Sequence, residues 1–349
     1  MSFLNTVLAE LGGFFGLTDW IIMIQKNDYS PLATAHGLIK AVWPVLPALL
    51  IFEVIRAIWA GSFRARQYRS ILLMYICNRA FSLWLSFSVM VFMIGLLTPV
   101  APFSVGISWY GLIYGYVVWE LGHFIYHFLA HKVRLFWCLH STHHAPENMN
   151  LFVGHSHFFL EGPYADFIRT STCILLGVSP PLLLLIMAID GLWGWFVHAG
   201  DDIIKDGRLG RLETWILTPS HHRVHHARNP IYMDRNYCNL LNIWDRFFGT
   251  LENEKPEVRP EYGINRPVDS GNFFDLYFGE VVLLAKDVWH APRLVDKVCY
   301  VVMPPGWSHT GQHKTAEALR RDYLSRHPGA VDQDGQQAAA PLPEPVARP

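Results

Sequence analysis

The chain has 349 residues, of which 51% are hydrophobic and only 16% are charged. Because soluble domains carry about 25% charged residues, this composition favours a membrane protein. The 28 basic and 29 acidic residues nearly cancel, which excludes the clustered basic surface of a nucleic-acid-binding protein. The five cysteines follow neither C-x-x-C nor zinc-ribbon spacing, so we expect reduced, packed thiols.

The apolar segments predict an all-α, integral membrane helical bundle of about four spans. Residues 1–40 lack the basic region and cleavage site of a secretory signal, and we interpret them as an interfacial or weakly inserted helix region. Spans are predicted at about 41–60, 80–106 and 109–130. Two prolines, Pro180 and Pro181, interrupt the apolar block 170–198, which favours a helical hairpin over one kinked span.

Basic residues predict the orientation of this bundle. Five arginines flank the loop between the first two spans: Arg56, Arg64, Arg66, Arg69 and Arg79. The loop near 100–108 carries none, so the first loop is expected in the cytoplasm. We therefore expect transmembrane helices within 41–200, a cytoplasmic helical cap at 201–327, and a disordered tail rich in Pro, Ala and Gln at 328–349.

Histidines gather in two stretches that repeat the spacing His-x-x-His-His. The two triplets are His140, His143 and His144, and His222, His225 and His226. On a helix, positions i, i+3 and i+4 share a face, so each triplet is expected to point its imidazoles at one locus. A third stripe at i+4 steps, formed by His123, His127 and His131, ends the third predicted span.

This pattern predicts a metal centre, because neutral imidazole suits iron, copper, zinc and nickel. The carboxylate-poor surroundings argue against magnesium or calcium. For the other histidines a structural role is favoured: His155 and His157 as polar loop residues, and His36, His290, His309, His313 and His327 as surface or packing residues. For His221 the two interpretations are equally favoured.

Metal-bound imidazoles need acceptors for their second ring nitrogen. The nearest carboxylates in the sequence are Glu120, Glu147, Asp201, Asp202 and Asp245. Among them Asp245, in "IWDRFFGT", is the favoured acceptor. A salt bridge of Asp245 with Arg246 or Arg223 is an equally favoured alternative.

Three stretches, "HFLAHKVRLFWCLHSTHH", "TPSHHRVHHARN" and "NYCNLLNIWDRFFGTLE", resemble the sterol desaturase and fatty acid hydroxylase superfamily of membrane di-iron enzymes. The third stretch and "MPPGWSH" most resemble the alkylglycerol monooxygenase-like branch and its bacterial relatives. The resemblance covers about residues 45–310. It implies a metal-ligand set of nine histidines: His127, His131, His140, His143, His144, His198, His222, His225 and His226. All of these except His198 are also implied to be catalytic.

The resemblance further implies two iron ions, O2 as co-substrate, a lipid substrate in the membrane, and an external redox protein or reduced cofactor that the sequence does not identify. Hydroxylation is favoured over desaturation, and a bacterial inner membrane over the endoplasmic reticulum. The chain departs from the family where "FIY" replaces a Tyr-Trp pair, and where Cys238 follows Asn236 and Tyr237 in place of glycine.

The alternatives are a zinc-dependent membrane hydrolase and a metal transporter. A hydrolytic zinc ion needs three protein ligands, so eight or nine histidines are excessive for it. A transporter is expected to place its ionisable ligands near the middle of the membrane, whereas these histidines lie at helix ends and in charged segments.

Overall fold

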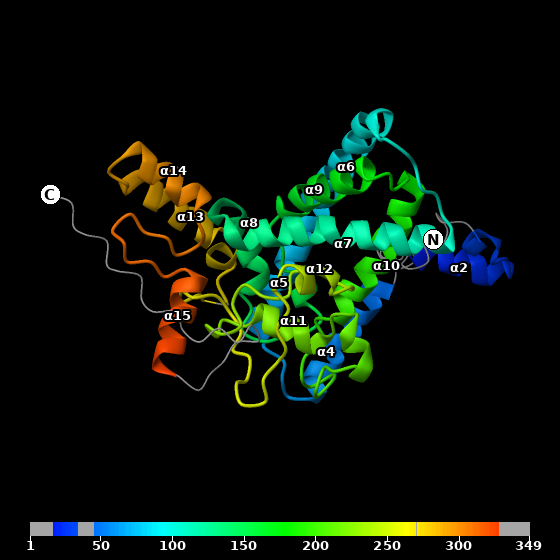
Figure 1. The fold of residues 1–349 in the computed structure, drawn as a ribbon. Helices are drawn as coiled ribbons and strands as arrows, with labels where there is room; N and C mark the ends of the chain where they lie inside the picture. The colour runs from blue at the N-terminus through cyan, green and yellow to red at the C-terminus, as the bar shows by residue number, and fades with distance from the viewer. Residues whose placement is uncertain (1–16, 34–44, 270, 328–349) are drawn as a thin grey trace.

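The computed structural model describes residues 17–33, 45–269 and 271–327 (Figure 1). Within these ranges the regular elements are helices, and β pairing is limited to isolated bridges such as that between Val105 and Val178. The predicted all-α class is confirmed for this part of the chain. His36 and the predicted tail at 328–349 lie outside the described residues.

The elements fall into an apolar half before residue 200 and a more polar half after it. The α-helices of the first half are α2 (Leu17–Lys26), α4 (Val45–Trp59), α5 (Ala65–Cys77), α6 (Leu83–Leu97), α7 (Trp109–Lys132), α8 (Arg134–His144), α9 (Glu161–Leu175) and α10 (Pro180–Phe196). Short helical turns are η1 (Ser30–Ala33), the π-helical η2 (Asn78–Ser82), η3 (Thr98–Val100) and η4 (Val153–His155). The second half contains η5 (Gly210–Thr214), α11 (Pro219–His226), α12 (Ile243–Phe247), α13 (Phe273–His290), α14 (Leu294–Val302) and α15 (Ala316–Arg326).

Helix α7 is the central element, and Figure 1 shows it crossing the molecule with α9 and α6 on one side and α12 on the other. It begins at an N-cap, where the Ser108 hydroxyl accepts a hydrogen bond from the Gly111 amide at 3.0 Å. It ends where Val133 turns to an extended backbone, and α8 starts at the next residue. The sharp change of direction brings the histidines of α7 and α8 together.

Two glycines allow α9 and α10 to pack closely on α7. A Cβ atom at Gly122 would lie 3.1 Å from the Cα atom of Arg169 in α9. A Cβ atom at Gly115 would lie 2.7 Å from the Cδ1 atom of Ile186 in α10. Around these contacts a core forms from Trp119, Cys173, Leu182 and further apolar side chains of the same helices.

One helical stretch of the described chain, Leu83–Val100, is long and apolar enough to cross a membrane, and α10 is a shorter apolar helix. Along α6 only Met90 and Met93 are buried, and Ile94 and Leu97 pack partly against the core. The exposed apolar side chains of α6 include Trp84, Phe87 and Phe92. The predicted interruption of the fourth apolar block is present, since α9 ends at Leu175 and α10 begins at Pro180. The block therefore forms two helices and not one.

The second half of the chain packs on the histidine-bearing helix α8. Helices α13 and α14 both contact α8. The Arg134 guanidinium pairs with Asp287 at 2.6 Å, and the Cys138 thiol donates to the Glu280 carbonyl at 3.4 Å. As predicted, the cysteines are free thiols; Cys138, Cys173 and Cys238 are buried.

Candidate metal centre

Nine buried histidines converge from four places in the chain. Helix α7 contributes two, α8 three, α11 three, and the turn after α10 one. Their ring nitrogens form one group of five and one group of four, and within each group one nitrogen of every residue lies within 4.8 Å of the others. The first group is His127, His131, His140, His144 and His225, and the second is His143, His198, His222 and His226. These are the nine residues predicted from the sequence; that they bind metal stays a prediction.

The expectation that each triplet points at one locus is wrong. In α8, His140 and His144 belong to the first group while His143 belongs to the second. In α11, His222 and His226 belong to the second group while His225 belongs to the first. Positions i and i+4 lie about 40° apart around a helix, whereas i+3 lies about 60° away on the other side of i. Each triplet therefore spans both groups.

The two groups lie against each other. The His144 and His226 rings stack with centroids 4.4 Å apart, although they belong to different groups. The His143 and His226 centroids are 4.5 Å apart, and those of His144 and His225 are 4.7 Å apart. The arrangement is that of two adjacent all-histidine sites.

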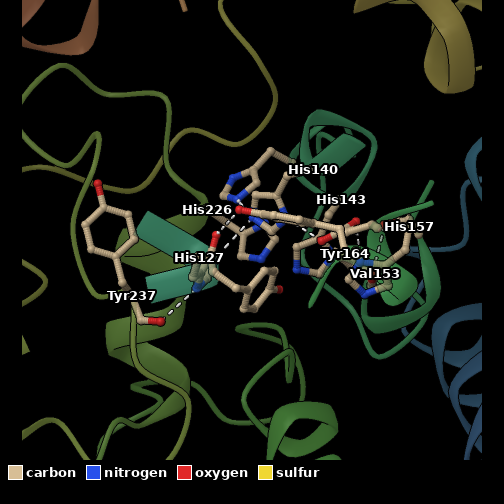
Figure 2. Close-up of polar contacts among 12 residues, drawn as sticks. His127, His140, His143, Val153, His157, Tyr164, His226 and Tyr237 are labelled. Carbon is tan, nitrogen blue, oxygen red and sulfur yellow. Dashed lines mark hydrogen bonds and ion pairs between the residues drawn. The ribbon is translucent and has the colours of Figure 1, made fainter. Parts of the chain in front are cut away.

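Backbone carbonyls orient several of these rings through the outer nitrogen. The Nδ1 atom of His127 donates to the Tyr237 carbonyl at 2.8 Å, as Figure 2 shows. The Nδ1 atoms of His225 and His198 donate to the Arg235 and Gly194 carbonyls at 2.8 Å and 2.5 Å. Because a carbonyl only accepts, these neutral rings carry their proton on Nδ1 and direct the Nε2 lone pair inward.

Two carboxylates hold further rings. Glu161 accepts from Nδ1 of His140 at 2.5 Å through one oxygen and pairs with Nδ1 of His157 at 2.8 Å through the other. Asp234 lies 3.4 Å from Nδ1 of His131 and also pairs with Lys132. Sequence reasoning missed both acids, because each lies outside the histidine motifs and no spacing rule links it to them.

The inner nitrogens fit a bound cation. Nε2 of His127 lies 3.0 Å from Nε2 of His140, and Nε2 of His198 lies 2.9 Å from Nε2 of His222. The outer nitrogen of His127 donates to a carbonyl and that of His140 contacts Glu161, so when both rings are neutral their inner lone pairs face each other, and a cation between them relieves the repulsion. Ligands about 2.1 Å from one ion and at right angles are about 3.0 Å apart.

Two more inner nitrogens support the same conclusion. Nε2 of His131 and Nε2 of His225 are buried and have no hydrogen-bond partner among the described residues. Burial is also the main cause that lowers the pKa of His143, His144, His222, His225 and His226 well below 6.5, with neighbouring imidazoles adding to it. The rings are thus neutral, which is the form that binds a metal ion.

Comparisons with known proteins agree with this site. The model of the fatty acid hydroxylase family matches residues 112–250, which include all nine histidines. Residues 112–250 are therefore similar in sequence to the fatty acid hydroxylase family. No solved structure matches the chain.

Curated relatives of this segment carry the names of a monooxygenase and of a lipid hydroxylase. Alkylglycerol monooxygenase of Xenopus tropicalis is 33% identical over 189 residues, 54% of this chain and 40% of the relative. The Homo sapiens enzyme of the same name is 32% identical over 200 residues, 57% and 42% of the two chains. Ornithine lipid hydroxylase OlsE of Rhizobium tropici is 28% identical over 160 residues, 46% and 47%. The chain thus spans less than half the length of these relatives, and the predicted resemblance is confirmed.

Asp245, the favoured acceptor, contacts no histidine. Its carboxylate accepts from the Tyr237 and Cys238 amides at 2.8 Å each and from the Thr250 hydroxyl at 2.6 Å. It pairs with neither Arg246 nor Arg223, so both predicted roles are wrong. Asp245 instead fixes the backbone whose Tyr237 carbonyl orients His127.

The other four candidate carboxylates also contact none of the nine clustered histidines. Glu120 accepts from the amides of Asn239, Leu240 and Leu241. Asp201 pairs with Arg223 at 2.7 Å and Asp202 with Arg56 at 2.6 Å. Glu147 is exposed. Among these acids, Glu120 therefore holds the backbone at residues 239–241.

The backbone tolerates cysteine at position 238, where the family has glycine. Positive φ occurs two residues earlier, at Asn236 with φ 57°, and not at Cys238. The turn therefore does not need glycine at Cys238. Burial raises the pKa of this thiol well above its usual range, so it stays protonated.

Histidines outside the two groups have other contacts, as predicted for most of them. His157 stacks on His143 with centroids 4.3 Å apart and pairs with Glu161. His155 accepts from the Trp195 indole at 3.0 Å. His221 contacts Thr218 and Asn253 near the start of α11. His290, His309, His313 and His327 bond to Lys286, Tyr300, Ser308 and Tyr323.

Two cavities reach the clustered histidines. The helix-side cavity, of about 470 Å³, lies among α5–α10 and is lined by eight histidines: His123, His127, His140, His143, His155, His157, His198 and His222. The C-terminal cavity, of about 480 Å³, is lined by His131, His144, His225 and His226 together with residues from 263 to 319. The two cavities share no lining residue.

Proposed function

We propose that the chain is a membrane-bound di-iron oxygenase that hydroxylates a C–H bond of a lipid. The observation that carries this proposal is the pair of adjacent all-histidine groups, each built from buried rings whose inner nitrogens converge. The monooxygenase and hydroxylase names of the relatives support the reaction class. They also favour hydroxylation over desaturation.

In this proposal the nine histidines hold two iron ions, which supply the activation of O2. One oxygen atom of O2 enters the C–H bond and the other leaves as water, with two electrons and two protons from an external donor. Glu161, Asp234 and the carbonyls at residues 194, 235 and 237 keep five ligand rings in place as the reaction proceeds. The donor is either a redox protein or a reduced cofactor.

The two cavities suggest separate routes for the reactants. The helix-side cavity opens among the apolar helices, where a lipid chain reaches His127 and His140 from the bilayer. The C-terminal cavity is lined by Arg228, Arg266 and Lys314 and meets the opposite side of the histidine groups. We assign access of the electron donor to this second cavity.

The membrane arrangement remains a proposal of four span-forming regions within 41–200, with the N-terminal region at the membrane interface and residues 201–327 as a cytoplasmic cap. Outward-facing Trp84, Phe92 and Trp109 are 72%, 65% and 76% exposed, which a lipid environment explains. In a bacterium the cytoplasmic side of the inner membrane would hold the active site.

The alternative is a zinc-dependent hydrolase, and metal analysis combined with O2 uptake distinguishes it from the di-iron oxygenase. Protein purified without added metal should contain about two irons per chain and consume O2 when a chemical reductant and membrane lipid are supplied. Lipids from cells that express the protein should show species heavier by one oxygen atom. Zinc in place of iron, with no uptake of O2, would refute the proposal.

A further inference from the structure

The helix-side cavity is more polar than a hydrocarbon chain requires. Its lining includes Ser82, Ser86, Asp166, Arg169 and Asp190 in addition to the histidines. Aliphatic chains gain nothing from such groups, whereas buried charges and hydroxyls need hydrogen-bond partners. The wall therefore points to a substrate that brings polar atoms into the cavity.

Arg169 is held in this wall with one donor unused. Its guanidinium lies over the rings of Trp119 and Tyr126, with centroids at 4.9 Å and 5.2 Å. Its Nη2 atom donates to Asp166 at 2.8 Å. Its Nε atom is buried and has no hydrogen-bond partner among the described residues. Because Nε–H only donates, its missing partner is an acceptor.

His123 offers a second unused atom in the same cavity. It lies one turn before His127 on α7, and the two ring centroids are 5.5 Å apart. Its Nδ1 atom is buried and has no partner in the described part of the chain. His123 belongs to neither histidine group, so this nitrogen is free for a ligand.

We propose that the helix-side cavity binds the oxygen-bearing part of a lipid, whose ether, ester, amide or hydroxyl oxygen accepts hydrogen bonds from Arg169 Nε and His123 Nδ1. This inference rests on the proposed function, and it names the substrate class of that site. His123 lies next to His127 of the first histidine group, with ring centroids 5.5 Å apart, so an oxygen bound at His123 lies near that group. Arg169 and His123 are then specificity-determining residues.

The test is binding of three probes that share a sixteen-carbon chain: hexadecane, hexadecan-1-ol and 1-O-hexadecylglycerol. Their affinities for the purified, iron-loaded protein in detergent are measured by displacement of a fluorescent lipid. The oxygenated probes should bind about 10-fold more tightly than hexadecane, the effect of one or two hydrogen bonds. Equal affinities for all three would overturn the inference without any variant.

Two variants test whether Arg169 and His123 cause the preference for oxygenated probes. Arg169→Lys keeps the charge beside Asp166 but lacks Nε, and His123→Phe keeps an aromatic ring but lacks Nδ1. Each should lose the preference for oxygenated probes while hexadecane affinity and iron content stay unchanged. Ser171→Ala, on α9 outside the cavity lining, is the matched control and should keep the preference. Retention of the preference in both variants would contradict the assignment.

The outcome separates this inference from the proposed function. A protein that prefers oxygenated probes but binds zinc and takes up no O2 retains the lipid site and loses the oxygenase proposal. An iron protein that consumes O2 but binds the three probes equally retains the oxygenase proposal and loses the polar-group site.

Discussion

His140 and Glu161 are joined by a 2.5 Å contact between the imidazole Nδ1 and one carboxylate oxygen. Both side chains are buried, with exposed fractions of 1% and 3%. Glu161 also holds His157, which stacks on His143 of the second histidine group. The Glu161 carboxylate therefore holds His140 of the first group directly and supports His143 of the second group through His157.

Replacing this acid should weaken metal binding more than folding. In Glu161→Gln the amide keeps the shape of the side chain but removes the charge that holds His140 and His157. We expect iron affinity to fall by about 10- to 100-fold, the usual cost of losing a partner of a ligand histidine. Competition with a chelator measures it. An unchanged affinity would show that Glu161 does not support the centre.

Asp234→Asn should have a smaller effect and serves as the comparison. Asp234 lies 3.4 Å from His131 Nδ1, which is longer than the His140–Glu161 contact, and it shares its charge with Lys132. The chelator titration should therefore rank the proteins as wild type, Asp234→Asn and Glu161→Gln in order of falling affinity. The reverse order of the two variants would contradict the geometry.

The division of each triplet predicts which ion is lost on mutation. His143→Ala removes one ligand of four in the second group, whereas His225→Ala removes one of five in the first. Each variant should retain about one iron per chain in place of two and lose oxygenase activity, because both ions are needed. Metal analysis and O2 uptake measure the two effects. His313→Ala, far from both groups in the sequence and exposed, should match wild type.

Retained activity in either ligand variant would refute the assignment of that histidine. Loss of both ions in one variant would instead show that the two sites fill cooperatively. The iron content of the two single variants distinguishes these cases, since independent sites leave about one iron in each, whereas the double variant should bind none in either case.

Asp245→Ala should destabilise the protein. The carboxylate is fully buried and accepts from two backbone amides, which the substitution leaves unpaired. We expect a loss of about 2–4 kcal/mol, from a cost of about 1–3 kcal/mol per unsatisfied buried group. Thermal unfolding in detergent measures the loss. Glu317→Ala, which removes an ion pair of a 78% exposed acid, should change stability by less than about 1 kcal/mol.

The identity of the clustered histidines was predictable, but their partition was not. The repeat and the family resemblance nominate the nine residues, because spacing along a helix is visible in the sequence. Which ring joins which group depends on where α7 and α11 lie relative to α8, and that is a property of tertiary packing. For the same reason Glu161 and Asp234 escaped prediction, whereas Asp245 was chosen for proximity in the sequence alone.

The helices could be predicted from the sequence, whereas the number of membrane spans could not. The all-α class and the break before Pro180 follow from apolar periodicity and proline chemistry. The number of spans does not, since α7 carries Glu120 and several histidines that reduce its apolar character. Only Leu83–Val100 meets the length and apolarity of a span among the described helices.

Thiol labelling should establish the sides of the membrane. Single cysteines at positions 104, 148 and 228, in a background without the five native thiols, occupy exposed sites. Position 104 lies between the second and third proposed spans, 148 follows the second histidine motif, and 228 follows the third. An impermeant reagent should label position 104 in intact cells, and label 148 and 228 only after permeabilisation.

Each alternative result has a definite meaning. Labelling of 104 and 148 under the same conditions would show that α7 does not cross the membrane, and the four-span proposal would be wrong. Different behaviour of 148 and 228 would place the two His-x-x-His-His motifs on opposite sides. That result is incompatible with the structure, because the ring centroids of His144 and His226 are 4.4 Å apart. It would also refute the shared metal centre.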